Sequence, residues 1–269
     1  MIYAICLNEQ SSLIEESTFE LDILNENISM YFNIIENSIL NESETSDKIK
    51  SMIKNIIEYI NRIFKLLSEK ATKFVKMIKE YITKIKNEVR LIFTGTISAD
   101  IPKITPTMER VGRIINRVES LELINKLIKH DIEYTDDDLK EKINNIMGHE
   151  ELGDIENLNI EDMIEFVHKD KLSPDEYIKE FDKSANVQVM LDTIENLDSC
   201  KKEFTNVAKS IQKEAEQEND PKKLNITSRL LKISTDLYNK SCSLYISAAT
   251  KIINDMGAIR NKFGKRVNK

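Results

Sequence analysis

The stretch that decides the fold is residues 46–93, SDKIKSMIKNIIEYINRIFKLLSEKATKFVKMIKEYITKIKNEVRLIF. Its apolar residues recur in steps of three and four, at positions 49, 53, 56, 60, 63, 67, 71, 74, 78, 82, 85, 89 and 92. Such steps place the apolar side chains on one side of an α-helix, in a heptad-like seam that is perturbed by consecutive steps of four. The pattern therefore predicts one long, basic, amphipathic helix over 47–93 that packs against more than one neighbouring helix.

The composition favours helices along the rest of the chain. Of 269 residues, 41% are hydrophobic and 32% are charged, but only 6 are Gly and 4 are Pro. Folds with many tight turns need more of these two residues, so an all-β sandwich or a doubly wound α/β fold is excluded. We therefore expect an all-α protein, an elongated helical bundle with long antiparallel helices and a few short helices between them.

Turn and capping residues divide this expected bundle into segments. An acidic leader, partly helical, covers 1–46, and an extended linker covers 94–105 after the long helix. Residues 106–182 are a short-helix region, in which Thr105-Pro106, Asn159 and Ser173-Pro174-Asp175-Glu176 each start a helix. The helix from Asn159 is expected to reach His168. Residues 183–269 are a C-terminal helical hairpin with a basic tail, and its two helices, about 184–217 and 221–259, meet at Asn219-Asp220-Pro221.

Residues of the kinds that carry catalysis or bind metals are scattered. Cys6, Cys200 and Cys242 are far apart, which indicates a reducing compartment, and Cys200 and Cys242 are expected to be buried structural residues. The sequence has no glycine-rich phosphate loop and no nucleophile elbow. Glu165 and His168 form one Glu-x-x-His motif, whereas a di-iron site in a helical bundle needs two copies and two further glutamates. We therefore expect no enzyme activity, no metal, no cofactor and no small-molecule substrate.

Charge is distributed unevenly along the chain. Residues 1–46 contain nine acidic and no basic residues, whereas residues 47–93 contain twelve basic and five acidic residues. This contrast suggests that the leader neutralises the helix within one chain, although a coding bias towards Lys, Asn, Ile and Glu would produce it too. Basic side chains on the helix are candidate contacts to an anionic surface, either DNA or lipid: Lys54, Arg62, Lys65, Lys73, Lys76 and Lys84.

The glutamates of the leader share a local pattern. Six of its eight follow Leu or Ile by two positions, against five of 21 in the rest of the chain. This leader resembles the acidic propeptides of internal head and other virion structural proteins of large tailed bacteriophages, whose prohead proteases cut after Leu/Ile-x-Glu. The resemblance implies cleavage at Glu42, just before the basic helix, and makes Glu26 and Glu15 further candidate cleavage sites.

Two functions are compatible with these features. The first is a non-enzymatic structural or assembly protein, a phage virion or internal head component, whose helices contact copies of itself or another helical protein. The alternative is a membrane-surface or pore-forming helical protein that uses the basic helix 47–93. The sequence shows neither a signal peptide nor a transmembrane helix, so the first function places the chain in the virion or in the host cytoplasm.

Overall fold

The computed structural model describes residues 46–92, 95–116 and 157–263. These residues are mostly helical, as the composition predicts. The long helices are α2 (Ser46–Ile92) and α10 (Pro221–Phe263). Between them in the sequence come three helices in succession, α7 (Pro174–Ala185), α8 (Val187–Glu195) and α9 (Leu197–Gln217).

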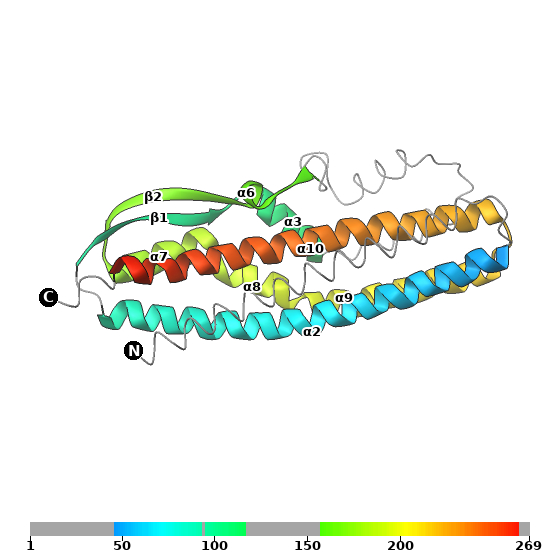
Figure 1. The fold of residues 1–269 in the computed structure, drawn as a ribbon, viewed down its shortest axis with the longest axis horizontal. Helices are drawn as coiled ribbons and strands as arrows, with labels where there is room; N and C mark the ends of the chain where they lie inside the picture. The colour runs from blue at the N-terminus through cyan, green and yellow to red at the C-terminus, as the bar shows by residue number, and fades with distance from the viewer. Residues whose placement is uncertain (1–45, 93–94, 117–156, 264–269) are drawn as a thin grey trace.

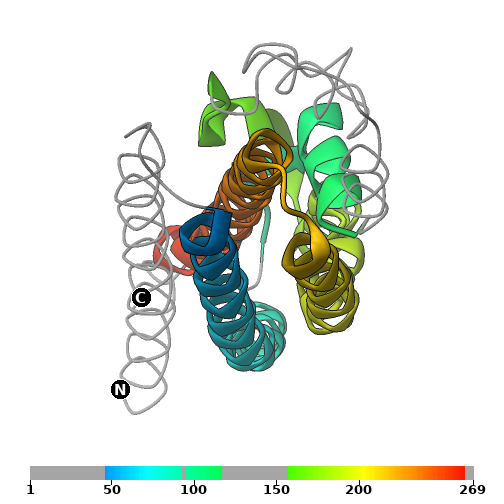
Figure 2. The same ribbon diagram turned by 90° about the vertical axis from the view of Figure 1, so that its right-hand side faces the viewer.

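The helices lie along the long axis of the molecule (Figure 1). Helices α2 and α10 run in the same direction, and α7, α8 and α9 return in the opposite direction. Seen from the end, α2 lies beside both α9 and α10 (Figure 2). The connection from α9 to α10 is held to the start of α2, because Lys50 Nζ donates to the Asn219 side chain at 3.0 Å and to the Glu216 carbonyl at 3.1 Å.

The first helix of the expected C-terminal hairpin is broken where the sequence predicted a continuous helix. Asn186 between α7 and α8 has a φ of 43°, in the left-handed region, and a second break at Asn196 separates α8 from α9. Apart from glycine, asparagine is one of the few residues that adopt the left-handed backbone conformation. The capping box at Ser173 and Glu176 is confirmed, since the Glu176 amide donates to Ser173 Oγ and the Ser173 amide donates to Glu176 Oε2.

The all-α prediction is confirmed only in part, because the mostly helical chain also contains a two-stranded antiparallel sheet. Strand β1 (Ile97–Ile104) lies within the expected linker, and β2 (Ile164–Leu172) replaces the second half of the helix expected from Asn159 to His168. Only α6 (Ile160–Met163) is helical in that segment, although Asn159 does cap it. The spacing of Ile160, Met163, Ile164 and Val167 fits a helix, so pairing with a strand about 60 residues away overrides the local pattern.

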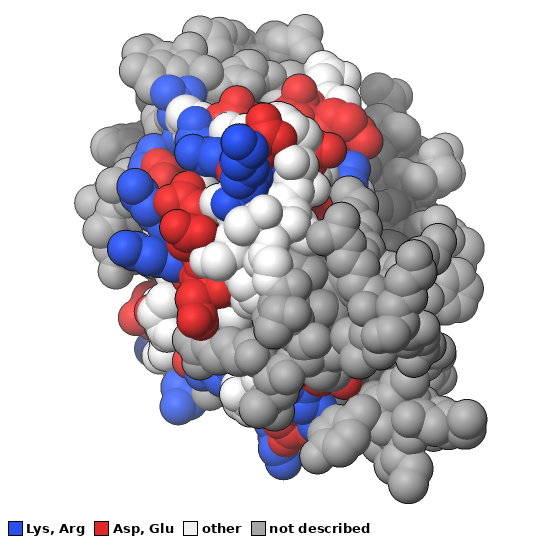
Figure 3. All heavy atoms as spheres, turned by 90° about the vertical axis from the view of Figure 1, so that its left-hand side faces the viewer, with Lys and Arg blue, Asp and Glu red and all other residues white. Residues whose placement is uncertain are grey.

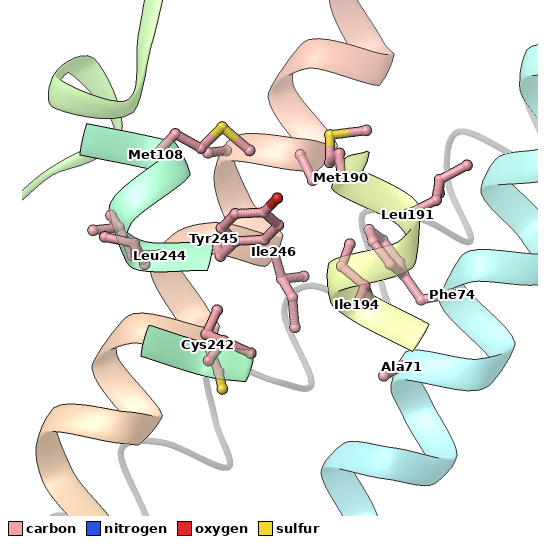
Figure 4. Packing of buried hydrophobic residues seen from close by; sticks show 14 of the residues in the cluster. Ala71, Phe74, Met108, Met190, Leu191, Ile194, Cys242, Leu244, Tyr245 and Ile246 are labelled. Carbon is pink, nitrogen blue, oxygen red and sulfur yellow. The ribbon is translucent and has the colours of Figure 1, made fainter. Parts of the chain in front are cut away.

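The core lies between the long helices and the short ones. Figure 4 shows Phe74 and Ala71 of α2 lying towards α8, with Met108 of α3 (Pro106–Asn116) and Tyr245 of α10 on the other side of α8. All four of these residues are buried. The short helices therefore fill the space that a simple pair of long helices would leave open.

The two cysteines of the described chain are structural, as the sequence predicts. Cys200 and Cys242 are both buried and unbonded to each other, and burial raises the pKa of each thiol. Cys200 Sγ donates to the Ile115 carbonyl at 3.1 Å, and Tyr238 Oη donates to the same carbonyl at 3.2 Å. These two bonds connect α9 and α10 to the Ile115 carbonyl of α3.

Candidate interaction surface on α2

Helix α2 has two chemically distinct sides. Its buried side is apolar and includes Ile53, Phe74, Ile78 and Val89, each fully buried. This side faces the neighbouring helices α8, α9 and α10. The other side carries charged residues that are open to solvent, which makes it a candidate interaction surface.

The charged side repeats every 11 residues. The segments 54–64, 65–75 and 76–86 read KNIIEYINRIF, KLLSEKATKFV and KMIKEYITKIK. Each begins with Lys, has Glu at its fifth position and has Lys or Arg at its ninth. Eleven residues are close to three helical turns, so equivalent positions lie almost in line along the helix, about 16.5 Å apart.

The repeat sorts the charges into three columns. One basic column is Lys54, Lys65 and Lys76, the acidic column is Glu58, Glu69 and Glu80, and the second basic column is Arg62, Lys73 and Lys84. All nine residues are exposed except Lys84, which is half-buried. Below, the three columns together are called the charged face of α2. Six basic and three acidic residues give this face a net charge of +3.

Most charges on this face are not used to hold the fold together. The only pair that the described chain forms within the columns joins Lys54 and Glu58 at 3.9 Å, with both side chains more than half exposed. Arg62, Lys65 and Lys73 form no ion pair within residues 46–92, 95–116 and 157–263. Exposed pairs of this kind contribute little to stability, so the regular spacing of the columns needs another explanation.

Other lysines of α2 do serve the fold. Lys86 binds Asp182 of α7 at 2.6 Å, and Lys79 binds Glu195 of α8. Together with Lys50 at the start of the helix, these lysines connect α2 to the returning chain. The structure therefore separates lysines that join helices from those of the charged face.

The six basic residues predicted as anionic-surface contacts are the two basic columns. The acidic column between them and the repeat that produces it were not predicted from the sequence. The apolar seam already indicated this repeat. Two steps of four residues follow each other at position 67 and again at position 78, 11 residues later. The candidate cleavage sites Glu42, Glu26 and Glu15 lie outside the described residues.

The comparisons with known proteins give no family for this chain. No protein-family model, curated protein or solved structure matches it. In the part that the structure describes, no helix is both long enough and apolar enough to cross a membrane. The same part contains no group of three or more His, Cys, Asp or Glu side chains placed to hold a metal ion.

The charged residues at the end of the molecule are not sorted in this way. Figure 3 looks onto the end where α2 and α10 finish, and basic and acidic side chains are interspersed across the described part of it. A mixed arrangement of this kind gives solubility without selecting a partner. The charged face of α2 differs from this end of the molecule in the regular order of its charges.

The sheet carries a polar cluster around His168 that differs from a catalytic arrangement. His168 Nδ1 is 2.7 Å from Asp100, His168 Nε2 is 3.3 Å from Asp170, and Ser98 Oγ donates to Asp170 at 2.6 Å. The Ser98 hydroxyl thus faces a carboxylate instead of the imidazole that would activate a nucleophile. Glu165, three residues before His168 on the same strand, lies on the opposite face of the sheet, so the Glu-x-x-His motif does not form a joint site.

The two carboxylates favour the protonated imidazolium. Hydrogen bonding to Asp100, and then to Asp170, raises the pKa of His168, whose side chain is 60% exposed. We expect the pKa of His168 to lie above its ordinary value of about 6.5, and Asp100→Asn to return it towards that value. Because the folded-state pKa is raised, the stabilisation is present below about pH 6.5 and is lost as the pH rises through the folded-state pKa.

Proton NMR titration of the histidine ring, in the intact chain and in the Asp100→Asn variant, checks this expectation. Asp175→Asn, an exposed carboxylate on α7, is the control and should leave the titration of His168 unchanged. Equal pKa values in the intact chain and the Asp100→Asn variant would show that the ring does not bind Asp100 in solution.

Proposed function

We propose that the chain is a non-enzymatic structural or assembly protein. In this proposal a helical bundle presents the charged face of α2 to copies of itself or to another helical protein. The 11-residue repeat of exposed charge carries the proposal, because a solvated surface needs charge but does not need it at a fixed spacing. Regular charges at the edge of a helix contact set the partner and its register.

The acidic leader supports a place for this assembly role in a phage virion. The proposal includes cleavage at Glu42, which would remove most of the leader's acidic residues and leave the charged face of α2 near the new N-terminus. Removal of eight acidic residues changes the net charge of the chain from −7 to +1. Cleavage would therefore increase the attraction of α2 for an acidic partner.

A membrane-surface role is the second candidate, and the net charge of +3 on the charged face favours it. Basic residues beside an apolar stripe bind anionic lipid when the stripe enters the interface. Here the apolar stripe of α2 is buried against other helices, with Phe74 and Ile78 fully buried. Insertion would require the bundle to open, whereas association through the charged face would not.

Reversing the charge of two residues in one basic column tests the proposal. The double variant Lys65→Glu, Lys76→Glu places acidic residues on both sides of Glu69, so we expect self-association, or binding of a helical partner, to weaken about tenfold or more. The free energy of unfolding should change by less than about 0.5 kcal/mol, because both side chains are exposed. Sedimentation velocity measures association, and urea denaturation measures stability.

The control is Lys209→Glu, Lys213→Glu, which makes the same change of charge at two exposed positions of α9. It should associate like the unmodified chain. Equal weakening in both variants would show that net charge, and not the charged face of α2, controls association. Flotation of the unmodified chain with phosphatidylserine vesicles, lost in the α2 variant alone, would favour the membrane role instead.

A further inference from the structure

Strand β2 leaves one edge of the sheet without a partner. Among the described residues the sheet has two strands, so β2 pairs with β1 on one edge only. Figure 1 shows β2 on the outer side of β1, away from the long helices. Residues Glu165, Phe166 and His168 are exposed, and Phe166, at 48% exposure, is one of the two large hydrophobic residues that are exposed in the described chain.

The sequence of this strand is complementary to itself when it is read in reverse. In an antiparallel pair centred on Val167, Glu165 of one strand faces Lys169 of the other, and Phe166 faces His168. Val167 then faces its own copy. The two-fold symmetry makes each of these two pairs occur twice. The pairing therefore places opposite charges and aromatic rings across from each other, and no like charges face each other.

The register avoids the irregular end of the strand. The pairing of β1 with β2 is regular from Ile104 with Ile164 to Ala99 with Lys169, and it shifts only beyond that point, where Lys171 has a φ of 55°. The five residues 165–169 therefore lie in continuous strand. Charged residues usually protect a sheet edge against pairing, but here the charges are placed to attract a second copy in one register.

We propose that two copies of this chain pair through β2, antiparallel and centred on Val167, to form a continuous four-stranded sheet. This contact is separate from the charged face of α2 and does not depend on the function proposed for that face. It satisfies the free backbone groups of β2 and covers part of Phe166, as in β-strand addition. The symmetric edge-to-edge contact closes on itself, so it gives a dimer and leaves no further strand edge of β2 open.

Charge reversal tests the register directly. Lys169→Glu alone places Glu opposite Glu165 twice, and Glu165→Lys alone places Lys opposite Lys169 twice, so each variant should lower dimer affinity about tenfold or more. A mixture of the two variants restores two Glu–Lys pairs between unlike chains. We therefore expect the mixture to form a heterodimer with close to the original affinity, measured by sedimentation velocity with one variant fluorescently labelled.

This rescue cannot come from within one chain. Glu165 also binds Lys103 of β1 at 2.6 Å, and Lys169 lies 3.6 Å from Glu180 of α7, so each variant loses one internal pair that mixing does not restore. Lys179→Glu, an exposed change on α7, is the control and should dimerise normally. If each variant dimerises weakly and the mixture forms no heterodimer, the proposed register is overturned.

A cross-link gives a second readout that does not depend on charge. Val167→Cys places two thiols at the symmetry axis, where facing strand residues have Cα atoms about 4.5–5.5 Å apart, within the range that a disulfide spans. Mild oxidation should convert this variant to a covalent dimer. The unmodified chain, oxidised in parallel, should not form this dimer, which controls for cross-linking through Cys6. Failure to cross-link under conditions in which the variant sediments as a dimer would also overturn the proposal.

Discussion

Replacing Phe74 by Ala should lower the free energy of unfolding by about 3–5 kcal/mol. Phe74 is fully buried near the middle of α2, and Figure 4 shows its ring lying towards Leu191 and Ile194 of α8. Removal of the ring leaves a cavity between two helices that are held apart by other contacts, so the cavity cannot close completely. Urea denaturation followed by circular dichroism measures the loss.

The neighbouring Lys73→Ala variant is the control for this prediction. Lys73 is exposed on the charged face of α2, so its removal should change stability by less than about 0.5 kcal/mol. A loss below about 1 kcal/mol for Phe74→Ala would contradict the burial of the apolar side of α2. It would favour a helix that is free to enter a membrane surface.

Replacing Gly257 by Ala should lower the free energy of unfolding by about 1–3 kcal/mol. A Cβ atom at this position in α10 would lie 2.2 Å from the hydroxyl of Tyr81, a buried residue of α2. Alanine is the better helix former by about 1 kcal/mol, so a helix propensity effect alone would give the opposite sign. Thermal or urea denaturation therefore distinguishes the two effects: close helix packing lowers the free energy of unfolding, whereas helix propensity raises it.

Tyr81→Phe is the partner variant for Gly257→Ala. It removes the hydroxyl that meets the new methyl group, so the double variant should recover much of the stability lost by Gly257→Ala. Gly112→Ala gives a graded comparison, because its Cβ would lie 3.0 Å from a ring carbon of Tyr245 and should cost less. A stabilised Gly257→Ala variant would show that α2 and α10 do not approach closely at Tyr81.

The parts of the fold that could be predicted are those that local chemistry determines. The apolar seam predicted a long helix where the structure has α2, and Asn219-Asp220-Pro221 marked the start of α10. The capping box at Ser173 predicted the start of α7. In each case the side chains that decide the structure lie within a few residues of the feature, so no distant contact is needed.

The sheet could not be predicted in the same way because its cause is distant in the sequence. Apolar residues have helix-like spacing from Ile160 to Val167, but only α6 is helical there, and β2 is extended through its pairing with β1. The break at Asn186 depends on one backbone conformation that asparagine tolerates but does not require. Both features depend on tertiary contacts that a single sequence does not reveal.

The candidate surface was only partly visible from the sequence. The six basic residues of the charged face were predicted because their charge is evident, but the sequence does not show which lysines of α2 bind other helices. Lys79 and Lys86 lie close to Lys76 and Lys84 in sequence, and the structure shows that Lys79 binds Glu195 and Lys86 binds Asp182. The tertiary structure is therefore needed to distinguish lysines that stabilise the fold from lysines that can meet a partner.

The assembly role is tested most directly by the mass of the full chain in solution. Static light scattering over a range of concentrations gives this mass, and a second series with phosphatidylserine vesicles, assayed by flotation, measures membrane binding. We predict that the mass rises above the 31.2 kDa of one chain with concentration, and that the chain does not float with the vesicles. A mass of one chain at every concentration, together with flotation on the vesicles, would contradict the assembly role.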